Sequence, residues 1–361
     1  MKKILLVATV SYHFNVFHLP FIRWLKQHGW EVHAAAGGRD QIEEVDRQIT
    51  LPISRSPIDR NNAAAYQELK SLLEAERYDI VHAHTPVGGV LGRLAARNVP
   101  ETKVYYTAHG FHFCDGSPLS SWLMYYPVER LCARWTDTLI TINEEDYKRA
   151  VSHRFPAGRI VHIHGVGLAE EKEDKQDIRQ ELGLPRDTDI LFYAAELNKN
   201  KNQRLLAEVI SYMRKPVHLV LAGIGDPEPV RQAAIEHGTA DRIHFLGNRR
   251  DVRSLYRQAT VAVASSLREG LPVNVMEAMS VKTPVVAVAN RGHRELLSGC
   301  GLLVGKDKPK EFAAALDTLL MNPELAKGLA DKAHQKIESV YTSRKVVNEL
   351  AGLYGEEAES G

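Results

Sequence analysis

The sequence predicts an α/β protein of two domains, each built on a parallel β-sheet whose strands are joined by helices. The 361 residues exceed the size at which one hydrophobic core stops growing, so two domains of about 150 to 180 residues are expected. Short apolar runs alternate with longer amphipathic segments, which is typical of parallel strands connected by crossover helices. A charged segment interrupts this alternation near the middle of the chain, after which the alternation starts again.

The composition is that of an ordinary globular protein. Hydrophobic residues make up 44% and charged residues 25%, and the formal net charge is +1. Because nucleic-acid binding requires a clear basic excess, this balance gives no indication of it. The three cysteines, Cys114, Cys132 and Cys300, are too few and too scattered for a disulfide framework or a zinc site. They fit a reducing compartment.

The N-terminal domain is predicted over residues 1–167. Its candidate strands are residues 4–9, 31–36, 79–84, 103–109, 138–142 and 160–164. The first run follows two lysines and could pass for a signal peptide, but it is short and no small-residue cleavage site follows it. We therefore interpret it as a buried strand. No apolar stretch approaches the ~20 residues that span a bilayer.

A charged linker is predicted over residues 168–186, followed by a C-terminal domain over residues 187–340. The candidate strands of that domain are residues 190–195, 218–222, 243–247, 261–265, 285–289 and 302–304. Helical segments are expected at residues 311–321, 323–339 and 343–354. The last of them lies in a C-terminal segment, residues 341–361, that we expect to return to the N-terminal domain.

The stretch SSLREGLPVNVMEAM carries the strongest functional information. Glu269 follows a predicted buried strand, Gly270-Leu271-Pro272 comes next, and a helix containing Glu277 begins there. Proline suits the first turn of a helix and Gly270 permits close backbone approach, so the unpaired amides can hold a diphosphate. Eight residues of helix separate the two carboxylates by about 12 Å, too far for a glycosidase pair. They suit the two ends of one long ligand.

This stretch resembles glycosyltransferase family 4, whose Glu-x7-Glu motif is matched by Glu269 and Glu277. The resemblance implies the GT-B fold, in which two Rossmann-like domains with parallel sheets face an interdomain cleft. It also implies retention of configuration and a nucleotide-sugar donor bound mainly by the C-terminal half. Glu277 would bind the ribose hydroxyls and Glu269 the transferred sugar, with the diphosphate on the segment formed by Gly270, Leu271, Pro272 and Val273. The alternative is an ordinary helix start with two solvated glutamates.

Two further segments resemble the family's donor site. In AAELNKNKNQ, Lys201 stands where the family has a lysine that meets the diphosphate, whereas Glu196 stands where an arginine is usual. Either Lys199 compensates for that missing charge or the phosphates depend more on the helix amides and Lys201. In FLGNRRDV, Gly247 and Asn248 occupy a loop after a strand, where the family holds the nucleotide base largely through backbone contacts.

Histidines are the candidate site residues of the N-terminal half. In TAHGFHF, His109 ends a predicted strand, where ligands gather in open α/β sheets, and the resemblance implies that it reaches the donor sugar or its phosphate. A histidine that satisfies a local carbonyl is the alternative. The loop SYHFNVFHLPF lacks the family's Gly-Gly pair, and we assign its His13, Asn15 and His18 to acceptor or donor contacts. Buried structural histidines would explain them as well.

Another group of histidines carries a weaker functional indication. His112, together with His82 and His84 in IVHAHT, can be explained as core or loop residues. No metal site is expected, because the Asp187-Thr188-Asp189 triplet precedes a strand in the linker region. No cofactor is expected beyond the nucleotide-sugar substrate.

The run HGFHFCDGSPLSSWLMYYPVERLCARWTD resembles bacterial transferases that build exopolysaccharide or capsule units on a lipid carrier. It implies transfer from a UDP-sugar, with an N-acetylhexosamine the leading choice, to a polyprenyl-diphosphate-linked saccharide. The expected location is cytoplasmic, peripheral on the inner face of the cell membrane. A nucleotide-sugar epimerase of the same fold and a non-catalytic polysaccharide-assembly subunit are the alternatives.

Six aromatic residues cluster in this run: Phe111, Phe113, Trp122, Tyr125, Tyr126 and Trp135. Trp and Tyr favour a membrane interface, and Arg130 and Arg134 could meet anionic headgroups. A helix buried in the N-terminal core would use Trp122, Leu123 and Tyr126, and it explains them equally well. Pro127 is expected to divide the segment into two helices.

Overall fold

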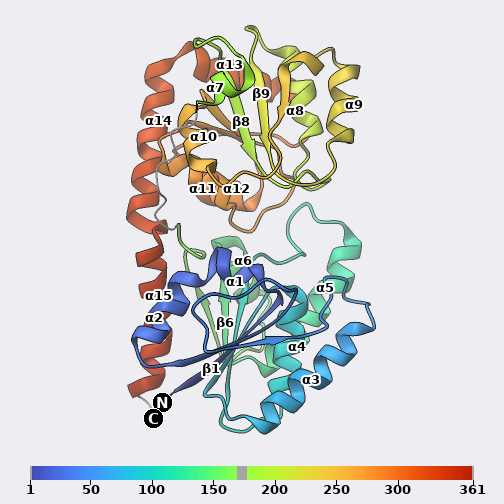
Figure 1. Ribbon diagram of the computed structural model, residues 1–361, viewed down its shortest axis with the longest axis vertical. Helices are drawn as coiled ribbons and strands as arrows, with labels where there is room; N and C mark the ends of the chain where they lie inside the picture. The colour runs from blue at the N-terminus through green and yellow to red at the C-terminus, as the bar shows by residue number, and fades with distance from the viewer. Residues whose placement is uncertain (1, 169–176, 360–361) are drawn as a thin grey trace. The chain divides into compact units, whose positions relative to one another are not determined.

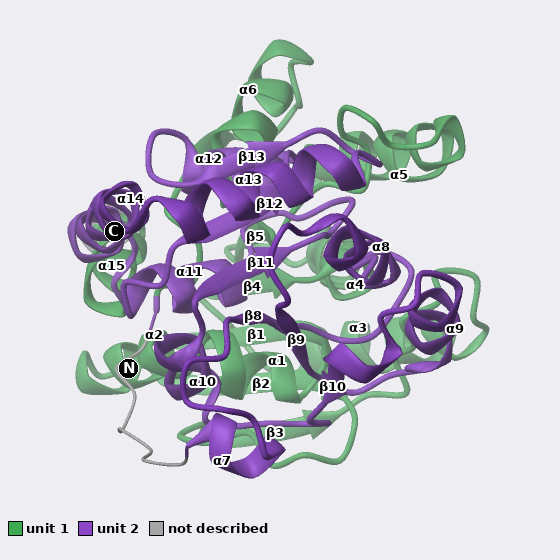
Figure 2. Cartoon of the chain, turned by 90° about the horizontal axis from the view of Figure 1, so that it is seen from above, with its two compact units in different colours: residues 1–167, 343–361 green, residues 168–342 purple. Residues whose placement is uncertain are grey.

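The computed structural model describes residues 2–168 and 177–359, which form two compact units (Figure 2). Unit 1 comprises residues 1–167 and 343–361, and unit 2 comprises residues 168–342. Within the predicted linker, residues 169–176 lie outside the described residues. The following residues belong to unit 2, where a short helix, α7 (Ile178–Leu182), begins at Asp177 with the Asp177 carboxylate as its N-cap.

Unit 1, whose strands β1 and β6 are labelled in Figure 1, contains a seven-stranded parallel sheet in the order β3-β2-β1-β4-β5-β6-β7. The strands are β1 (Lys3–Val10), β2 (Glu31–Gly37), β3 (Arg47–Thr50), β4 (Ile80–His84), β5 (Lys103–Ala108), β6 (Thr138–Thr141) and β7 (Arg159–His162). The sequence predicts all of them except β3. That strand lies at the sheet edge and is half-exposed, so it has no apolar run to reveal it.

The helices of unit 1 cover both faces of this sheet. They are α1 (Tyr12–Phe17), α2 (Leu19–Gln27), α3 (Asn61–Ala75), α4 (Pro86–Ala96), α5 (Leu119–Cys132), α6 (Glu144–Ser152) and α15 (Ser343–Glu359), with a 3-10 turn at Ala133–Trp135. Helix α4 lies very close to the sheet. A Cβ added to Gly88 would be 2.9 Å from the backbone of Ala8, and one added to Gly89 would be 2.3 Å from Tyr106. The glycine pair therefore permits close helix-to-sheet packing.

Helix α5 runs through Pro127 without a break, so the predicted division into two helices is wrong. Proline removes one backbone N–H, which leaves the carbonyl four residues earlier, that of Leu123, without its helical partner. Leu123 and Pro127 are both exposed, so water can satisfy that carbonyl.

Helix α15 belongs to unit 1 although it ends the chain. The Tyr354 hydroxyl lies 2.6 Å from Nδ1 of His82, which is buried in β4. The Tyr105 hydroxyl donates to the Leu353 carbonyl at 3.1 Å, and the Glu349 carboxylate accepts from the backbone N–H of His164 at 2.9 Å. These contacts attach the C-terminal segment to the central strands of unit 1.

Unit 2 contains a six-stranded parallel sheet in the order β10-β9-β8-β11-β12-β13. The strands are β8 (Ile190–Ala194), β9 (His218–Ala222), β10 (Ile243–Phe245), β11 (Val261–Ala264), β12 (Val285–Val288) and β13 (Leu302–Val304), and the sequence predicts all six. Almost every residue in β8, β9, β11 and β12 is buried, as in a parallel sheet covered on both faces. The α/β fold class is confirmed.

The helices of unit 2 surround that sheet. They are α7, α8 (Arg204–Val209), α9 (Glu228–Glu236), α10 (Val252–Gln258), α11 (Val273–Ser280), α12 (Arg291–Leu297), α13 (Pro309–Met321) and α14 (Pro323–Lys336), with 3-10 turns at Ile210–Tyr212 and Ala240–Arg242. Helix α14 continues as a π-helical turn at Ile337–Tyr341. Among the described residues, no helix is both long and apolar enough to cross a bilayer.

Candidate functional site

The residues predicted to bind the donor lie in unit 2, in loops that follow the strands of its sheet. Lys201 lies between β8 and α8, Asn248 between β10 and α10, and Glu269 between β11 and α11. The carboxyl ends of parallel strands share one edge of the sheet, where ligands bind in open α/β folds. The topology therefore brings these three loops to the same edge.

Lys201 and Glu269 form an ion pair. The Lys201 Nζ lies 2.6 Å from Oε1 of Glu269, and their side chains are only 21% and 13% exposed. Hydrogen bonds to backbone carbonyls also join the two loops. The Ser265 hydroxyl donates to the Lys201 carbonyl at 2.7 Å. Asn200 donates from its amide to the Arg268 carbonyl at 3.0 Å. The structure thus brings together a cation and a carboxylate that the sequence places 68 positions apart.

The segment from Gly270 to Val273 leads directly into α11. Helix α11 begins at Val273, and Pro272 at its N-cap provides no side-chain hydrogen bond. The first-turn amides of a helix have no acceptor within it, so this uncapped end can bind an anion. The estimate of 12 Å between the glutamates does not apply, because Glu269 precedes the helix by four residues.

Glu277 lies half-buried on α11, beside the buried Tyr256. Burial raises the pKa of Tyr256 above its usual range, and the nearby Glu277 carboxylate adds to that effect. Asn248 is exposed, and the Gly247 before it has a left-handed backbone with φ of 65°. The Gly247 carbonyl accepts from the Gly223 amide at 2.7 Å, which ties the loops after β9 and β10 together.

Two residues bear on the arginine that the family usually has and this chain lacks, and both are exposed in the structure. Glu196, at the usual arginine position, is exposed, and its backbone carbonyl accepts from the Gln203 amide at 2.9 Å. Lys199 is exposed as well.

The sequence analysis missed the residues of α12 that support the Glu269 loop. Arg291 is buried and donates from Nε to the Glu269 carbonyl at 2.9 Å. A Cβ added to Gly292 would be 2.8 Å from Pro272 and 3.0 Å from Cβ of Glu269. Asn290 caps α12 by accepting from the His293 amide at 3.0 Å. Asn290, two residues after the end of β12, is a residue type that favours helix N-caps, and it could have revealed this support.

In unit 1 the structure brings together His13, His18 and His109, and adds His84. Nε2 of His13 lies 3.1 Å from Nε2 of His18, and Nδ1 of His84 lies 3.3 Å from Nε2 of His109. The rings of His13 and His109 have centroids 4.8 Å apart and meet edge to face. Asn15 is not part of this group. Its amide donates to the Gln41 carbonyl at 2.7 Å and accepts from the Glu43 N–H, so it braces a loop.

Burial keeps these imidazoles neutral. Desolvation lowers the pKa of His109 to about 4 and that of His82 to about 3. It also lowers the pKa of His13, His18 and His84 well below the usual value, with neighbouring histidines adding to the effect. Neutral imidazoles can both donate and accept hydrogen bonds.

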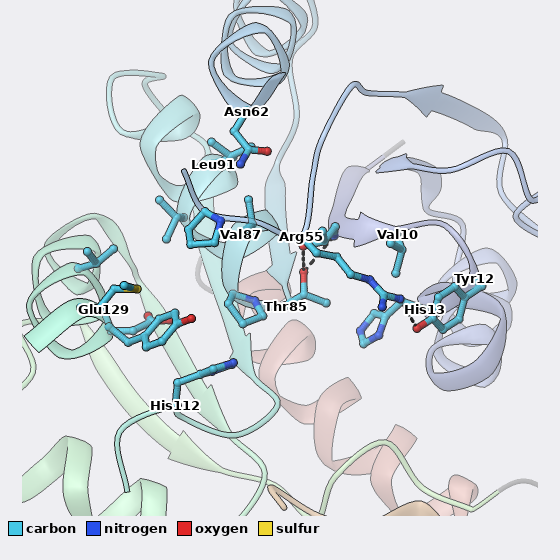
Figure 3. Close-up of a pocket in the computed structure, with 17 residues that line it drawn as sticks. Val10, Tyr12, His13, Arg55, Asn62, Thr85, Val87, Leu91, His112 and Glu129 are labelled. Atoms are coloured by element: carbon cyan, nitrogen blue, oxygen red, sulfur yellow. Dashed lines mark hydrogen bonds between the residues drawn. The ribbon is translucent and has the colours of Figure 1, made fainter. Parts of the chain in front are cut away.

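A pocket of about 540 Å³ adjoins the histidines in unit 1 (Figure 3). It is lined by residues at the ends of β1 and β4, by the Arg55 loop, and by helices α4 and α5. Arg55 donates from Nη2 to the Tyr12 hydroxyl at 2.7 Å, as the dashed line in Figure 3 shows. The lining is mainly apolar, and His13, Arg55 and His112 are among its polar members.

One wall of the pocket contains a buried ion pair that the sequence analysis did not identify. Arg93 is fully buried and donates from Nη2 to Glu129 at 2.7 Å, while the Tyr106 hydroxyl donates to the other carboxylate oxygen at 2.9 Å. The guanidinium also lies 3.7 Å from the centroid of the Tyr106 ring. These contacts hold the Glu129 carboxylate in the position in which Glu129 lines the pocket.

Helix α5 places aromatic and aliphatic side chains on different sides. Trp122, Tyr125 and Tyr126 pack against the core of unit 1, so the core interpretation holds for these aromatic residues. The exposed side is aliphatic instead: Leu119, Leu123, Met124, Val128 and Leu131 are between 41% and 72% exposed. The core interpretation is therefore wrong for Leu123, which lies on the outward side of the helix. Arg130 donates to the carbonyls of His153 and Arg154, whereas Arg134 is exposed.

Comparison with known proteins identifies the family. The model of glycosyl transferases group 1 matches residues 174–336, and that of the glycosyl transferase 4-like domain matches residues 17–165. The chain is 45% identical, over 98% of its length and 96% of the relative's, to a protein of Bacillus subtilis strain 168 named "Putative glycosyltransferase EpsD". The chain belongs to the family 4 type of glycosyltransferases. The resemblance noted from the Glu-x7-Glu motif is confirmed.

A more distant relative is also named a glycosyltransferase, and solved structures share the fold. The UDP-Gal:alpha-D-GlcNAc-diphosphoundecaprenol alpha-1,3-galactosyltransferase of Escherichia coli is 27% identical over 79% of this chain and 77% of its own. Among solved structures, HepE of Anabaena in complex with UDP and glucose has a TM-score of 0.81 at 17% identity, covering 99% of this chain and 100% of that one. The two parallel sheets and this likeness establish the GT-B fold for the family 4 chain.

Proposed function

We propose that this glycosyltransferase moves a sugar from a UDP-sugar to a polyprenyl-diphosphate-linked saccharide, with retention of configuration, in exopolysaccharide or capsule biosynthesis. The observation that carries the proposal is the Lys201–Glu269 pair beside the uncapped start of α11. This arrangement offers a cation and free amides to a diphosphate, and a carboxylate to a sugar. The galactosyltransferase of Escherichia coli, whose name specifies a UDP-sugar donor and a diphosphoundecaprenol-linked acceptor, supports this choice of substrates.

In this proposal the donor binds along unit 2. The N–H groups of Gly270, Leu271 and Val273 and the Lys201 ammonium meet the diphosphate, and Pro272 stands at the N-cap of the helix beside it. The charge that develops on the leaving group is therefore stabilised by groups already in place. Glu277 accepts from the ribose hydroxyls and Glu269 from the transferred sugar. The loop at Asn248 holds the base, and an N-acetylhexosamine is the leading choice of sugar.

His109 contacts the transferred sugar or its phosphate. Its neutral imidazole can donate a hydrogen bond to a phosphate oxygen or exchange hydrogen bonds with a sugar hydroxyl. The acceptor hydroxyl attacks from the leaving-group side, and a phosphate oxygen takes its proton. The proposed transfer uses no metal ion.

The apolar pocket of unit 1 supports a lipid-linked acceptor. Met124 and Val128 line this pocket and also belong to the exposed aliphatic side of α5, so the apolar lining continues onto the surface. A hydrocarbon chain that is partly in a membrane and partly on the protein needs such a continuous apolar path. We therefore propose that the prenyl chain lies on Met124 and Val128, with His13 and His18 on the saccharide or diphosphate side. The protein would act as a peripheral protein on the inner face of the cell membrane.

Transfer assays with a synthetic acceptor test the proposal. The chain is incubated with each of a panel of UDP- and GDP-sugars, with and without a short-chain prenyl-diphosphate saccharide, and released nucleotide is measured together with the lipid product. We expect release that depends on the acceptor and is fastest with a UDP-N-acetylhexosamine. Lys201→Met should reduce the rate by about 10- to 1,000-fold, because one group that stabilises the leaving phosphate is lost. Glu236→Gln, an exposed change on α9, serves as the matched control.

The alternative functions give different results in the same assay. An epimerase would interconvert the donor sugar without any acceptor, and a non-catalytic assembly subunit would turn over none of the nucleotide sugars. Either result would contradict the proposed transfer.

A further inference from the structure

Four histidines of unit 1 lie close enough to share one ligand. His13 lies on α1, His18 between α1 and α2, His84 at the end of β4 and His109 just after β5. Each can offer one ring nitrogen, and these four nitrogens all lie within 4.8 Å of one another. We refer to these residues as the four-histidine cluster. The proposed transfer assigns a donor contact to His109 and acceptor contacts to His13 and His18, but it leaves the convergence of all four imidazoles unexplained.

The spacing of the nitrogens is close to that of a tetrahedral metal site. Zinc–nitrogen bonds of about 2.0–2.1 Å place the four nitrogens of a tetrahedron about 3.4 Å apart. The His13–His18 pair, at 3.1 Å, and the His84–His109 pair, at 3.3 Å, are already near that value. The widest separation of 4.8 Å would have to shrink by about 1.4 Å, which small rotations of the imidazoles can supply.

The rings also approach from different directions. The interplanar angle is 88° between His13 and His109, 78° between His18 and His109, and 44° between His18 and His84. Flat parallel stacking would prevent the nitrogens from converging on a point, whereas crossed rings allow it. The geometry therefore permits coordination by all four side chains.

The chemistry of the cluster favours transition metals. Imidazole nitrogens are common metal ligands, and three of the four side chains are buried while that of His109 is half-buried. Imidazole donors suit Zn²⁺, Co²⁺, Ni²⁺ and Cu²⁺, whereas Mg²⁺ and Ca²⁺ prefer oxygen ligands. His82 lies next to the cluster but is already occupied, since its Nδ1 pairs with Tyr354 and its Nε2 with Thr107.

The position of the cluster in the fold also suits a ligand. It lies at the carboxyl ends of β1, β4 and β5, and the order of the sheet reverses at β1, between β2 and β4. Ligands of open α/β sheets bind at such a switch point. His13 also lines the pocket of unit 1, which offers a path of entry (Figure 3).

We propose that the four-histidine cluster binds one divalent transition-metal ion, with Zn²⁺ the best fit, and that this ion takes no part in sugar transfer. Four neutral ligands leave both positive charges uncompensated in a buried place, so we expect micromolar rather than nanomolar affinity. Bound Zn²⁺ would occupy a ring nitrogen of His109 and thereby inhibit transfer. This last consequence rests on the proposed function, whereas the binding itself does not.

Metal titration of the full chain, without a polyhistidine tag and without nucleotide sugar, tests the proposal. Zn²⁺ is titrated against a chromophoric chelator, and Co²⁺ is added separately while the visible d–d absorption is recorded. We expect one Zn²⁺ per chain, a rise in the melting temperature with Zn²⁺ but not with Mg²⁺, and the intense Co²⁺ bands of a tetrahedral site. No saturable Zn²⁺ binding, or only the weak bands of octahedral Co²⁺, would overturn the proposal.

Substitutions locate the site. His84→Gln and His18→Gln should each weaken Zn²⁺ binding by at least about tenfold, because each removes one ligand. His112→Gln is the matched control, since His112 lines the same pocket but lies outside the four-histidine cluster, and it should bind Zn²⁺ like the parent. Equal affinity in the parent and in both cluster variants would contradict the assignment. If a variant does not fold, the Co²⁺ spectrum of the parent decides.

The two proposals fail separately. A chain that binds Zn²⁺ stoichiometrically but transfers no sugar in the metal-free assay keeps the metal site and loses the proposed function. A chain that transfers sugar but binds no Zn²⁺ keeps the proposed function and loses the metal site.

Discussion

At the scale of single residues, the donor site is organised around the ion pair between Lys201 and Glu269. The family resemblance brought Lys201 and Glu269 to attention separately, and a role in donor binding stays a prediction for both. Their ion pair was not predictable, because it depends on two loops that follow β8 and β11, strands that are neighbours in the sheet but distant in the chain. The pair also implies that a bound diphosphate must compete with Glu269 for Lys201.

Glu277→Ala should weaken the binding of free UDP. If Glu277 accepts from both ribose hydroxyls, its removal leaves them without an acceptor, at a cost of about 1–3 kcal/mol. That loss corresponds to roughly a 5- to 150-fold rise in Kd, measured by isothermal titration calorimetry. Glu236→Ala on the exposed side of α9 is the control. An unchanged Kd for Glu277→Ala would remove Glu277 from the ribose site.

His109→Ala should lower turnover far more than UDP affinity. A side chain that contacts the transferred sugar or its phosphate acts mainly in the transition state, whereas free UDP lacks the sugar. The kcat and the Kd for UDP are measured on the same preparation, with circular dichroism to verify folding. His153→Ala, at the C-terminal end of α6 where the His153 ring contacts the Tyr126 hydroxyl, provides a comparison. Turnover at the parental rate would make His109 a structural residue of the four-histidine cluster.

At the scale of elements, α5 shows why composition alone misleads. The aromatic residues that suggested a membrane interface pack inward, because Phe113, Trp122 and Tyr126 form contacts with one another in the core of unit 1. The side that faces outward is aliphatic, and its residues look like core residues in the sequence. Only the tertiary packing decides which side of such a helix is buried.

Membrane binding should therefore depend on the aliphatic side of α5. We expect the parent to sediment with anionic liposomes at low salt, and Leu119→Ser with Leu123→Ser to reduce this without lowering the melting temperature, since both side chains are exposed. Trp122→Ser should instead lower stability by several kcal/mol, because its ring packs against the core. Liposome binding that survives the double change, or that the parent never shows, would place the lipid acceptor elsewhere.

The fold of the whole chain was predictable where strands are buried on both faces. The runs of β8 and β12 are apolar throughout, and β1 is apolar except for Lys3 and Thr9. The predicted limits of all three agree with the structure to within one residue. The edge strand β3 was missed because its side chains are half-exposed. The four-histidine cluster was only partly foreseen, because His84 joins it through sheet register and not through any sequence motif.

The C-terminal helix α15 links the end of the chain to the core of unit 1 through Tyr354. This side chain is buried, and its ring contacts those of Phe21, Trp30 and Tyr105 at centroid distances of 5.1, 5.8 and 5.2 Å. Its hydroxyl satisfies Nδ1 of the buried His82. The stability of unit 1 should therefore depend on a residue near the end of the chain.

Tyr354→Ala should destabilise unit 1 by about 3–5 kcal/mol, because it opens a cavity among three aromatic rings. Tyr354→Phe keeps the ring but leaves Nδ1 of His82 without its partner, so its cost should be smaller, about 1–3 kcal/mol. Hydrogen exchange followed by mass spectrometry measures the two units separately, which matters because a two-domain chain need not unfold in one step. Protection should fall in β1, β4 and β5 and stay unchanged in β8, β9 and β11. Tyr212→Ala, which removes a partly exposed ring of unit 2, is the control. Equal losses in both units, or a larger loss for Phe than for Ala, would contradict this role of α15.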